Sequence, residues 1–423
     1  MKPEFALRRV LVKNTTIQLV AQAVAVSTGL ANSLVLSRYL GVEGFGQFSY
    51  VLAFYYFFLT LNDFGINTIV VREISQHRDR AAEIIGAMQT FKVGFALLLL
   101  LGAWGVIWLL QFPPDLRNAL WLFGLVLPTL AFQLPVVIFQ VNLEAESPAL
   151  VGTFNRCLGF VLIVAAVLLG RGLAAVTAAL VLSELFSLGL LLHFTRRWVR
   201  PTWQLTPRIW MEILRSSVPL GLAGLCSALI NRVDFIMLER MTDLHQLGLY
   251  SAAYKVTNLL ESFPLMLMGT IYPVMSRWAK EDPPRLARLY RRTLLTLSLV
   301  AIPLGILVTT AAPWIVRLIF GTEFSGTVPA LRVLVWSTVS LYLAIAGGNL
   351  LISLGRERTN LILNLFGAVL NVALNLWLIP VWGLIGAAWA TTCTFVFVLA
   401  GVSVASHVAL QATLPAPTLS ELA

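Results

Sequence analysis

The sequence predicts an all-α membrane protein with about 12 transmembrane helices, arranged as two parallel six-helix repeats around a central cavity. Three observations predict it: the composition, the length of the apolar runs, and short segments that recur at a fixed spacing. Of the 423 residues, 58% are hydrophobic and only 12% are charged, whereas about a quarter of a soluble domain is charged. The apolar runs are continuous, as in VGFALLLLLGAWGVIWLL (93–110). Continuous runs favour helices over the alternating strands of a barrel.

Hydropathy and turn signals predict the spans in chain order. They cover residues 14–38, 47–71, 84–110, 119–141, 149–169, 173–194, 214–240, 247–275, 293–311, 329–354, 359–379 and 384–407. The first is too long for the apolar region of a cleavable signal, so we interpret it as a span. The predicted domains are an N-terminal lobe (1–194), a basic linker (195–213), a C-terminal lobe (214–408) and a tail (409–423).

The basic residues predict the orientation. With the N-terminus inside, the cytoplasmic segments hold 20 lysines and arginines, and the outer loops hold only 3. This bias predicts that both termini are cytoplasmic in a bacterial or archaeal plasma (inner) membrane. It also accounts for the net charge of +10, so no nucleic-acid partner is expected. The basic linker, with Trp198, Trp203 and Trp210, is either an amphipathic segment on the anionic inner leaflet or a plain connection.

The two halves resemble each other. LSRYLGVEGFGQFSY (36–50) follows the first span, and LERMTDLHQLGLYSA (238–252) follows the seventh. Arg38, Gly46 and Ser49 match residues of the same type at an offset of 202. The alternative is coincidence between two apolar sequences. Because an even number of spans separates equivalent helices, a true repeat has parallel halves, which can rock about a site near the midplane.

Ionisable residues within the spans predict a polar cavity or structural pairs, since isolated charges are costly in lipid. The deep set is Asp63, Lys92, Arg156, Glu184, Arg232, Asp234, Lys255 and Glu261. Matching depth predicts that Asp63 pairs with Lys92 near the cytoplasmic side. A stripe of amides on one helix face, Asn360, Asn364, Asn371 and Asn375, either lines the cavity or joins helices; we favour the cavity.

The sequence carries no motif for catalysis or for a bound metal. It lacks a GxSxG elbow, a phosphate-binding GxxxxGK[ST] loop and any metal-ligand spacing among its 4 histidines. The predicted outer loops are short. We therefore expect a protein that is not an enzyme and has no resident metal.

Several segments resemble one known family. These are SRYLGVEGFGQFSYVLAF (37–54), NDFGINTIVVREIS (62–75), SVPLGLAGLCSALINRVDFIML (217–238) and LNLWLIPVWGLIGAAWATT (374–392). Their order over about residues 8–408 is similar to that in the polysaccharide-biosynthesis flippases, the Wzx-type members of the multidrug/oligosaccharidyl-lipid/polysaccharide exporter superfamily. Multidrug exporters of the same superfamily share the twelve-helix plan.

The resemblance implies a function. The family moves a polyprenyl-pyrophosphate-linked oligosaccharide, an O-antigen or exopolysaccharide repeat unit, from the inner to the outer leaflet by alternating access. Its implied partners are this substrate, membrane lipids and polysaccharide assembly proteins. The alternative is an ion-coupled multidrug or small-molecule exporter.

The roles of individual residues are inferred from position and charge. The cations Lys92, Arg156, Arg232 and Lys255 would bind the pyrophosphate, and the four asparagines the sugar hydroxyls. The acids Asp63, Glu184, Asp234 and Glu261 would be structural or would carry a coupling proton or sodium ion. Asp234 is the first choice for coupling because its counterpart at the offset of 202 is the neutral Asn32.

Overall fold

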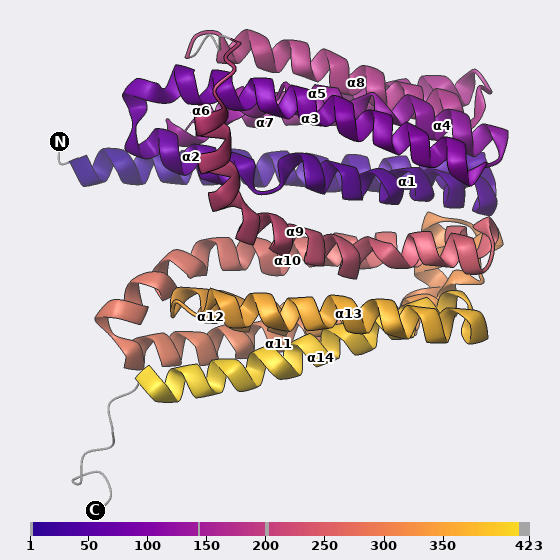
Figure 1. Ribbon diagram of the computed structural model, residues 1–423. Helices are drawn as coiled ribbons and strands as arrows, with labels where there is room; N and C mark the ends of the chain where they lie inside the picture. The colour runs from indigo at the N-terminus through magenta and orange to yellow at the C-terminus, as the bar shows by residue number, and fades with distance from the viewer. Residues whose placement is uncertain (1–2, 143, 199–202, 414–423) are drawn as a thin grey trace, which may run out of the picture. The chain divides into compact units, whose positions relative to one another are not determined.

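The computed structural model describes residues 3–142, 144–198 and 203–413, with the side chains of 3–12, 14 and 15 left aside. Throughout these ranges the secondary structure is helical, with no strand. The chain divides into two compact units, Met1–Ala228 (unit 1) and Leu229–Ala423 (unit 2). Figure 1 shows each unit as a set of helices, most of them long.

Unit 1 contains α1 to α8 and the beginning of α9. Its helices are α1 (Pro3–Asp63), α2 (Ile66–Gln76), α3 (Ala81–Leu110), α4 (Pro114–Gly124), α5 (Val126–Ala131), α6 (Val137–Val141), α7 (Glu146–Leu168), α8 (Gly172–Thr195) and α9 (Pro207–Met241), with 3-10 turns η1 (Arg78–Arg80) and η2 (Leu134–Val136). The long α1 is broken at Gly41, whose φ of 66° lies in the left-handed region that glycine tolerates.

Unit 2 begins within α9 and contains the remaining elements. They are α10 (Leu244–Glu281), α11 (Pro283–Ile319), the 3-10 turn η3 (Thr322–Phe324), α12 (Thr327–Ser353), α13 (Glu357–Trp382) and α14 (Leu384–Thr413). The break between α9 and α10, at residues 242–243, lies 202 residues after Gly41. That spacing equals the offset of the sequence matches. The superposition of the two halves stays a prediction.

The described helices confirm about twelve spans. Ten stretches are long and apolar enough to cross a membrane, and the bent pair Pro114–Ala131 with Leu134–Val141 adds an eleventh. The first stretch, Thr16–Gln76, has 61 residues, far more than the ~20 that cross a bilayer. Because it is broken at Gly41, it supplies two spans.

Proline explains why the fourth span is bent. Pro135 has no backbone N–H, so the carbonyl of Ala131 has no helical donor. The side chain of Gln89, from α3, donates a hydrogen bond of 2.8 Å to this carbonyl. The two parts of the span meet at 45°. A buried glutamine thus satisfies the backbone group that the proline leaves open.

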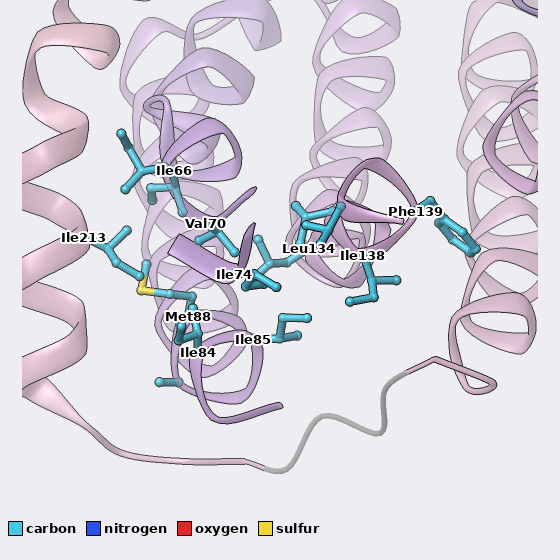
Figure 2. Close-up of a cluster of buried hydrophobic side chains, with 14 of the residues drawn as sticks. Ile66, Val70, Ile74, Ile84, Ile85, Met88, Leu134, Ile138, Phe139 and Ile213 are labelled. Atoms are coloured by element: carbon cyan, nitrogen blue, oxygen red, sulfur yellow. The ribbon is translucent and has the colours of Figure 1, made fainter. Parts of the chain in front are cut away.

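A core of aliphatic side chains holds α2, α3, α6 and the first turns of α9 together. Figure 2 shows Ile66 and Val70 of α2 beside Met88 of α3 and Ile213 of α9. Ile213 is only 2% exposed. The N-terminal part of α9 therefore packs with unit 1, although the predicted seventh span began at residue 214.

The predicted linker and the predicted tail each overlap a helix and include residues that the structure does not describe. In the predicted linker 195–213, α9 begins as early as Pro207, and residues 199–202, with Arg200, lie outside the described residues. In the predicted tail 409–423, α14 continues to Thr413, and residues 414–423 are not among those described. Pro219 lies inside α9, which Figure 1 draws bent along its length; proline is a common cause of such bends.

Candidate functional site

The predicted pair of Asp63 and Lys92 is present in unit 1. Lys92 Nζ lies 3.7 Å from Asp63 Oδ1 and donates a hydrogen bond of 3.1 Å to Asn67 Oδ1. The Lys92 side chain is 2% exposed, whereas that of Asp63 is 46% exposed. A buried ammonium needs polar partners because water cannot solvate it. In this arrangement Lys92 faces its partners rather than open space, and its contact with a pyrophosphate stays a prediction.

A pocket opens beside Asp63, entirely within unit 1. Its volume is about 470 Å³, within the range of about 300–1,000 Å³ that small-molecule sites occupy. It is lined by Tyr56, Leu59, Thr60, Asp63, Phe64, Gly65, Thr68, Leu220, Gly221 and Gly224. The lining comes from the end of α1, the start of α2 and the N-terminal half of α9.

The wall of the pocket is shaped by the break between α1 and α2. Phe64 and Gly65 have positive φ angles of 39° and 74°, so the chain changes direction directly after Asp63. A Cβ added to Gly221 would lie 2.5 Å from the Phe64 ring, and one added to Gly65 would lie 2.6 Å from Leu220 Cβ. The break between α1 and α2 therefore packs closely against α9.

The other predicted charges of unit 1 are placed differently. Glu184 of α8 accepts a hydrogen bond from Gln133 Nε2, at the bend of the fourth span, and one of 2.7 Å from Asn155 Nδ2 of α7. It therefore ties three spans together. Arg156, also on α7, is exposed. The structure does not bring Glu184 or Arg156 into the lining of the pocket beside Asp63.

Asp234 lies in a buried polar layer of unit 2. It is 0% exposed. Its Oδ2 accepts hydrogen bonds from the Tyr250 hydroxyl and, at 3.3 Å, from Thr391 Oγ1, and its Oδ1 accepts one of 3.0 Å from the Phe235 amide. The donors come from α9, α10 and α14. The carboxylate thus joins three helices by its hydrogen bonds.

The cations and the second acid of unit 2 lie near one another. The Arg232 guanidinium is 5.3 Å from the centroid of the Phe235 ring and 5.2 Å from that of Tyr254, distances typical of cation–π contacts. Arg232 also interacts electrostatically with Lys255 and with Glu261, both on α10. Arg232, Lys255 and Glu261 are partly buried. This group of charges, on α9 and α10, is the site in unit 2 best suited to an anion such as a phosphate.

The amide stripe of α13 is divided between two environments. Asn371 and Asn375 are 0% exposed. Asn371 Nδ2 donates 3.3 Å to Thr394 Oγ1 of α14, and Asn375 Nδ2 donates 3.0 Å to Asn371 Oδ1. Asn360 and Asn364 are partly buried, and Asn364 bonds the Asn360 carbonyl at 2.8 Å. Asn371 therefore joins α13 to α14, whereas the hydrogen bonds of Asn375 stay within α13. The sugar-binding role of the stripe stays a prediction.

Sequence reasoning missed the neutral partners of these charges. Asn67, Tyr250 and Thr391 each bond a predicted charged residue, and Tyr56 lines the pocket. Uncharged hydroxyls and amides occur throughout the spans, so their types alone did not single them out. Tyr250 lay in a segment singled out for the repeat, and Asn67 and Thr391 lay in segments that resemble the family.

Comparison with solved structures shows the fold. An inward-facing multidrug resistance MATE family transporter of the MOP superfamily aligns with a TM-score of 0.76 at 16% identity, over 91% of this chain and 94% of that one. The lipid II flippase MurJ, in an inward closed conformation, aligns with a TM-score of 0.76 at 13% identity, over 91% of this chain and 86% of that one. The fold is therefore that of the MOP-superfamily membrane transporters.

Comparison of sequences narrows the class to a family. The family model "Polysaccharide biosynthesis protein" matches residues 11–279, more than half of the chain, and the MatE model matches residues 219–377. The chain belongs to the polysaccharide biosynthesis protein family, and its described helices are those of a multi-pass membrane protein.

Individual relatives are distant. The chain is 28% identical over 176 residues to an uncharacterized membrane protein, MJ1068, of Methanocaldococcus jannaschii, and 26% identical over 149 residues to a probable low-salt glycan biosynthesis flippase, Agl15, of Haloferax volcanii. It spans about a third of the length of each, 34% and 32%. A putative O-antigen transporter of Shigella flexneri is 21% identical over 89% of this chain and 93% of its own length.

Proposed function

We propose that the protein is a flippase that moves a polyprenyl-pyrophosphate-linked oligosaccharide from the inner to the outer leaflet. The observation that carries the proposal is the polysaccharide biosynthesis family match over residues 11–279. The similarity to the putative O-antigen transporter, which extends over nearly the whole of both chains, and the similarity to a probable glycan biosynthesis flippase support it.

The chemistry of the spans is consistent with such a substrate. A pyrophosphate needs cations to leave water, because its charge is costly in a low-dielectric interior. Unit 2 offers Arg232 and Lys255, and the charge of Arg232 acts on both Lys255 and the acid Glu261. We propose that these two cations bind the pyrophosphate, and that Arg156, the exposed cation of α7, contributes from unit 1. Lys92 is held by Asp63 and Asn67. The polyprenyl tail stays in lipid.

The direct test is transport by purified protein in proteoliposomes. Undecaprenyl pyrophosphate carrying a radiolabelled N-acetylhexosamine is supplied on one side, and its arrival on the other is measured with a glycosidase that cannot cross the bilayer. We expect transfer well above that of protein-free vesicles, and a loss of at least tenfold for the double variant Arg232→Gln with Lys255→Gln. Transfer at the protein-free rate by folded wild-type protein would refute the proposal.

The second candidate function is ion-coupled export of multidrug-type compounds. The MatE match over residues 219–377 and the MATE-type fold favour it. The same proteoliposomes distinguish the two, because an exporter would accumulate an organic cation such as ethidium in response to an imposed ion gradient. Ethidium accumulation without transfer of the lipid-linked sugar would favour the exporter.

We propose that both termini lie in the cytoplasm, because basic residues are concentrated in the segments predicted to be cytoplasmic.

We also propose that Asp234 carries the coupling proton or sodium ion. Asp234 is fully enclosed, and its carboxylate accepts hydrogen bonds from Tyr250 and Thr391, so it is a buried acid with polar partners. Asp234→Asn keeps the size and removes the titratable group. We expect it to abolish the response of transport to an imposed ion gradient.

Glu184→Gln provides the comparison, because Glu184 is also a hydrogen-bonded acid but lies in unit 1. We expect this variant to keep the gradient response. The folded yield of each variant is measured beside its activity, since a weakened polar layer alone can lower the rate. If Asp234→Asn kept both the rate and the gradient response, Asp234 would be excluded as the coupling site.

A further inference from the structure

The pocket of unit 1 combines an acceptor with apolar and hydroxyl-bearing walls. Asp63 Oδ1 is buried and has no hydrogen-bond partner in the part of the chain that the structure describes, and Lys92 Nζ lies 3.7 Å from it. Because the Asp63 side chain is nevertheless 46% exposed, its second oxygen, Oδ2, is the acceptor available to the pocket. A carboxylate with one oxygen beside a buried ammonium and the other open to a cavity is suited to accept hydrogen bonds from a ligand.

The rest of the lining fits a sugar ring. Tyr56 and Phe64 provide aromatic surface, Leu59 and Leu220 provide aliphatic surface, and Tyr56, Thr60 and Thr68 add hydroxyls. Sugars present both C–H faces and hydroxyl edges, so they need apolar area together with a few placed polar groups. The volume of about 470 Å³ leaves room for one or two sugar rings.

The charges of the pocket exclude the other end of the proposed substrate. Asp63 and Lys92 form a pair without net charge, so the pocket has no excess positive charge for a pyrophosphate and suits the uncharged part of the molecule. It is also poorly suited to an organic cation, because Lys92 beside Asp63 leaves the pair without net charge. The cations of unit 2, in contrast, suit the pyrophosphate.

We propose that the pocket beside Asp63 is a sugar-binding subsite for the lipid-linked glycan, in which Asp63 accepts hydrogen bonds from ring hydroxyls and Tyr56 packs on the ring. This inference rests on the proposed function and adds to it the residues that recognise the sugar. It assigns recognition of the sugar to unit 1.

The test compares the binding of two probes to the purified full chain in nanodiscs. One probe is undecaprenyl pyrophosphate, and the other is the same lipid carrying N-acetylglucosamine, N-acetylgalactosamine or glucose. We expect at least one sugar-bearing probe to bind about tenfold more tightly than the bare lipid, the effect of one or two hydrogen bonds to a charged acceptor. Asp63→Asn and Tyr56→Leu should each remove most of this preference and leave the affinity for the bare lipid unchanged.

Two matched controls lie elsewhere in unit 1. Glu83→Gln neutralises an exposed acid paired with Arg80, and Phe154→Leu removes an exposed aromatic ring of α7. We expect both to keep the preference for the sugar-bearing probe. A preference that survives in both Asp63→Asn and Tyr56→Leu, or that wild-type protein lacks for all three sugars, would overturn the subsite.

A second measurement does not depend on altering Asp63, whose loss could disturb the buried Lys92. Thr60→Cys places a thiol in the lining, in a chain whose exposed Cys157 and Cys393 are changed to serine. We expect the sugar-bearing probe to slow thiol labelling at residue 60 and the bare lipid to leave it unchanged. Equal labelling with both probes, or protection by ethidium in place of the sugar probe, would contradict the proposal.

The outcomes also separate the two proposals. If neither lipid binds and the transport assay fails, the proposed function fails. If both lipids bind equally and transport proceeds, only the subsite beside Asp63 is refuted.

Discussion

The two units each contain a deep aspartate, and the surroundings of these two residues are opposite. Asp63 of unit 1 is about half exposed, lines a pocket and stands 3.7 Å from a buried lysine. Asp234 of unit 2 is fully enclosed and bonded to Tyr250, Thr391 and the Phe235 amide. Both are aspartates predicted to lie within spans. The difference teaches that the partners, rather than the acid, decide whether such a charge can meet a ligand.

The same contrast extends to the cations. Unit 1 holds Lys92 by a hydrogen bond to Asn67, with the side chain 2% exposed. Unit 2 holds Arg232 over the rings of Phe235 and Tyr254 and leaves it partly exposed. An arginine can stack on aromatic faces and still present N–H groups at its edge, whereas a lysine has only a point charge to offer. This difference supports the proposal that the pyrophosphate binds mainly in unit 2.

The largest expected effect is on stability, from Asp234→Ala. This change leaves the buried Tyr250 hydroxyl with only a long contact of 3.4 Å to Thr391 and empties a fully enclosed site. Each buried donor left without a partner costs about 1–3 kcal/mol, so we expect the free energy of unfolding to fall by roughly 3 kcal/mol. Asp63→Asn, which keeps an oxygen toward Lys92, should cost less than about 1 kcal/mol. Denaturation of both variants in mild detergent checks the comparison; equal losses would remove the distinction between the two acids.

Sequence alone predicted the membrane spans and one pair of charged residues on adjacent spans. The apolar runs predicted the spans because lipid imposes a length on each helix. The pair of Asp63 and Lys92 followed from equal depth on neighbouring spans. The orientation of the termini and the parallel repeat came from the same kind of reasoning and stay predictions.

Partners distant in the sequence could not be predicted. Thr391 bonds Asp234 from 157 residues away, and only the packing of α14 brings it there. For Asn371 and Asn375, the helical period predicted a common face but not the neighbour of that face, which proved to be α14 for Asn371. The break at Phe64 was missed because a positive φ is uncommon for a residue other than glycine.

The next expected effect concerns the wall of the pocket, and two glycines of α9 provide a matched pair. A Cβ at Gly221 would lie 2.5 Å from the Phe64 ring, whereas one at Gly224 would lie 3.5 Å from Thr60 Cγ2, an ordinary contact. Gly221→Ala must displace a bulky ring, so we expect a loss of about 1–3 kcal/mol. Gly224→Ala should be neutral or slightly stabilising, since alanine favours the helix by up to about 1 kcal/mol.

The same pair tests whether the pocket depends on the break between α1 and α2. Gly221→Ala should also weaken the preference for the sugar-bearing lipid, because moving Phe64 moves the neighbouring Asp63. Gly224→Ala should keep this preference. Thermal unfolding and the nanodisc binding assay measure the two effects separately, and similar behaviour of the two variants would show that the break does not determine the pocket.

The smallest expected effect concerns how unit 2 holds its cation. Arg232→Lys keeps the charge but removes the planar group that lies 5.3 Å from the Phe235 ring centroid. A cation–π contact at a partly exposed site contributes about 0.5–1 kcal/mol, so we expect the variant to lose roughly 0.5 kcal/mol of stability. A loss this small needs a double-mutant cycle with Phe235→Leu to be assigned to the ring. If the stacking contributes, the double variant should be destabilised by about 0.5 kcal/mol less than the sum of the single variants. Strict additivity would show that Phe235 packs beside Arg232 without stabilising its position.

The affinity for bare undecaprenyl pyrophosphate, measured on the Arg232 variants, separates the two roles of this residue. It should fall further in Arg232→Gln than in Arg232→Lys, because the anion requires the charge whereas the ring requires the planar guanidinium.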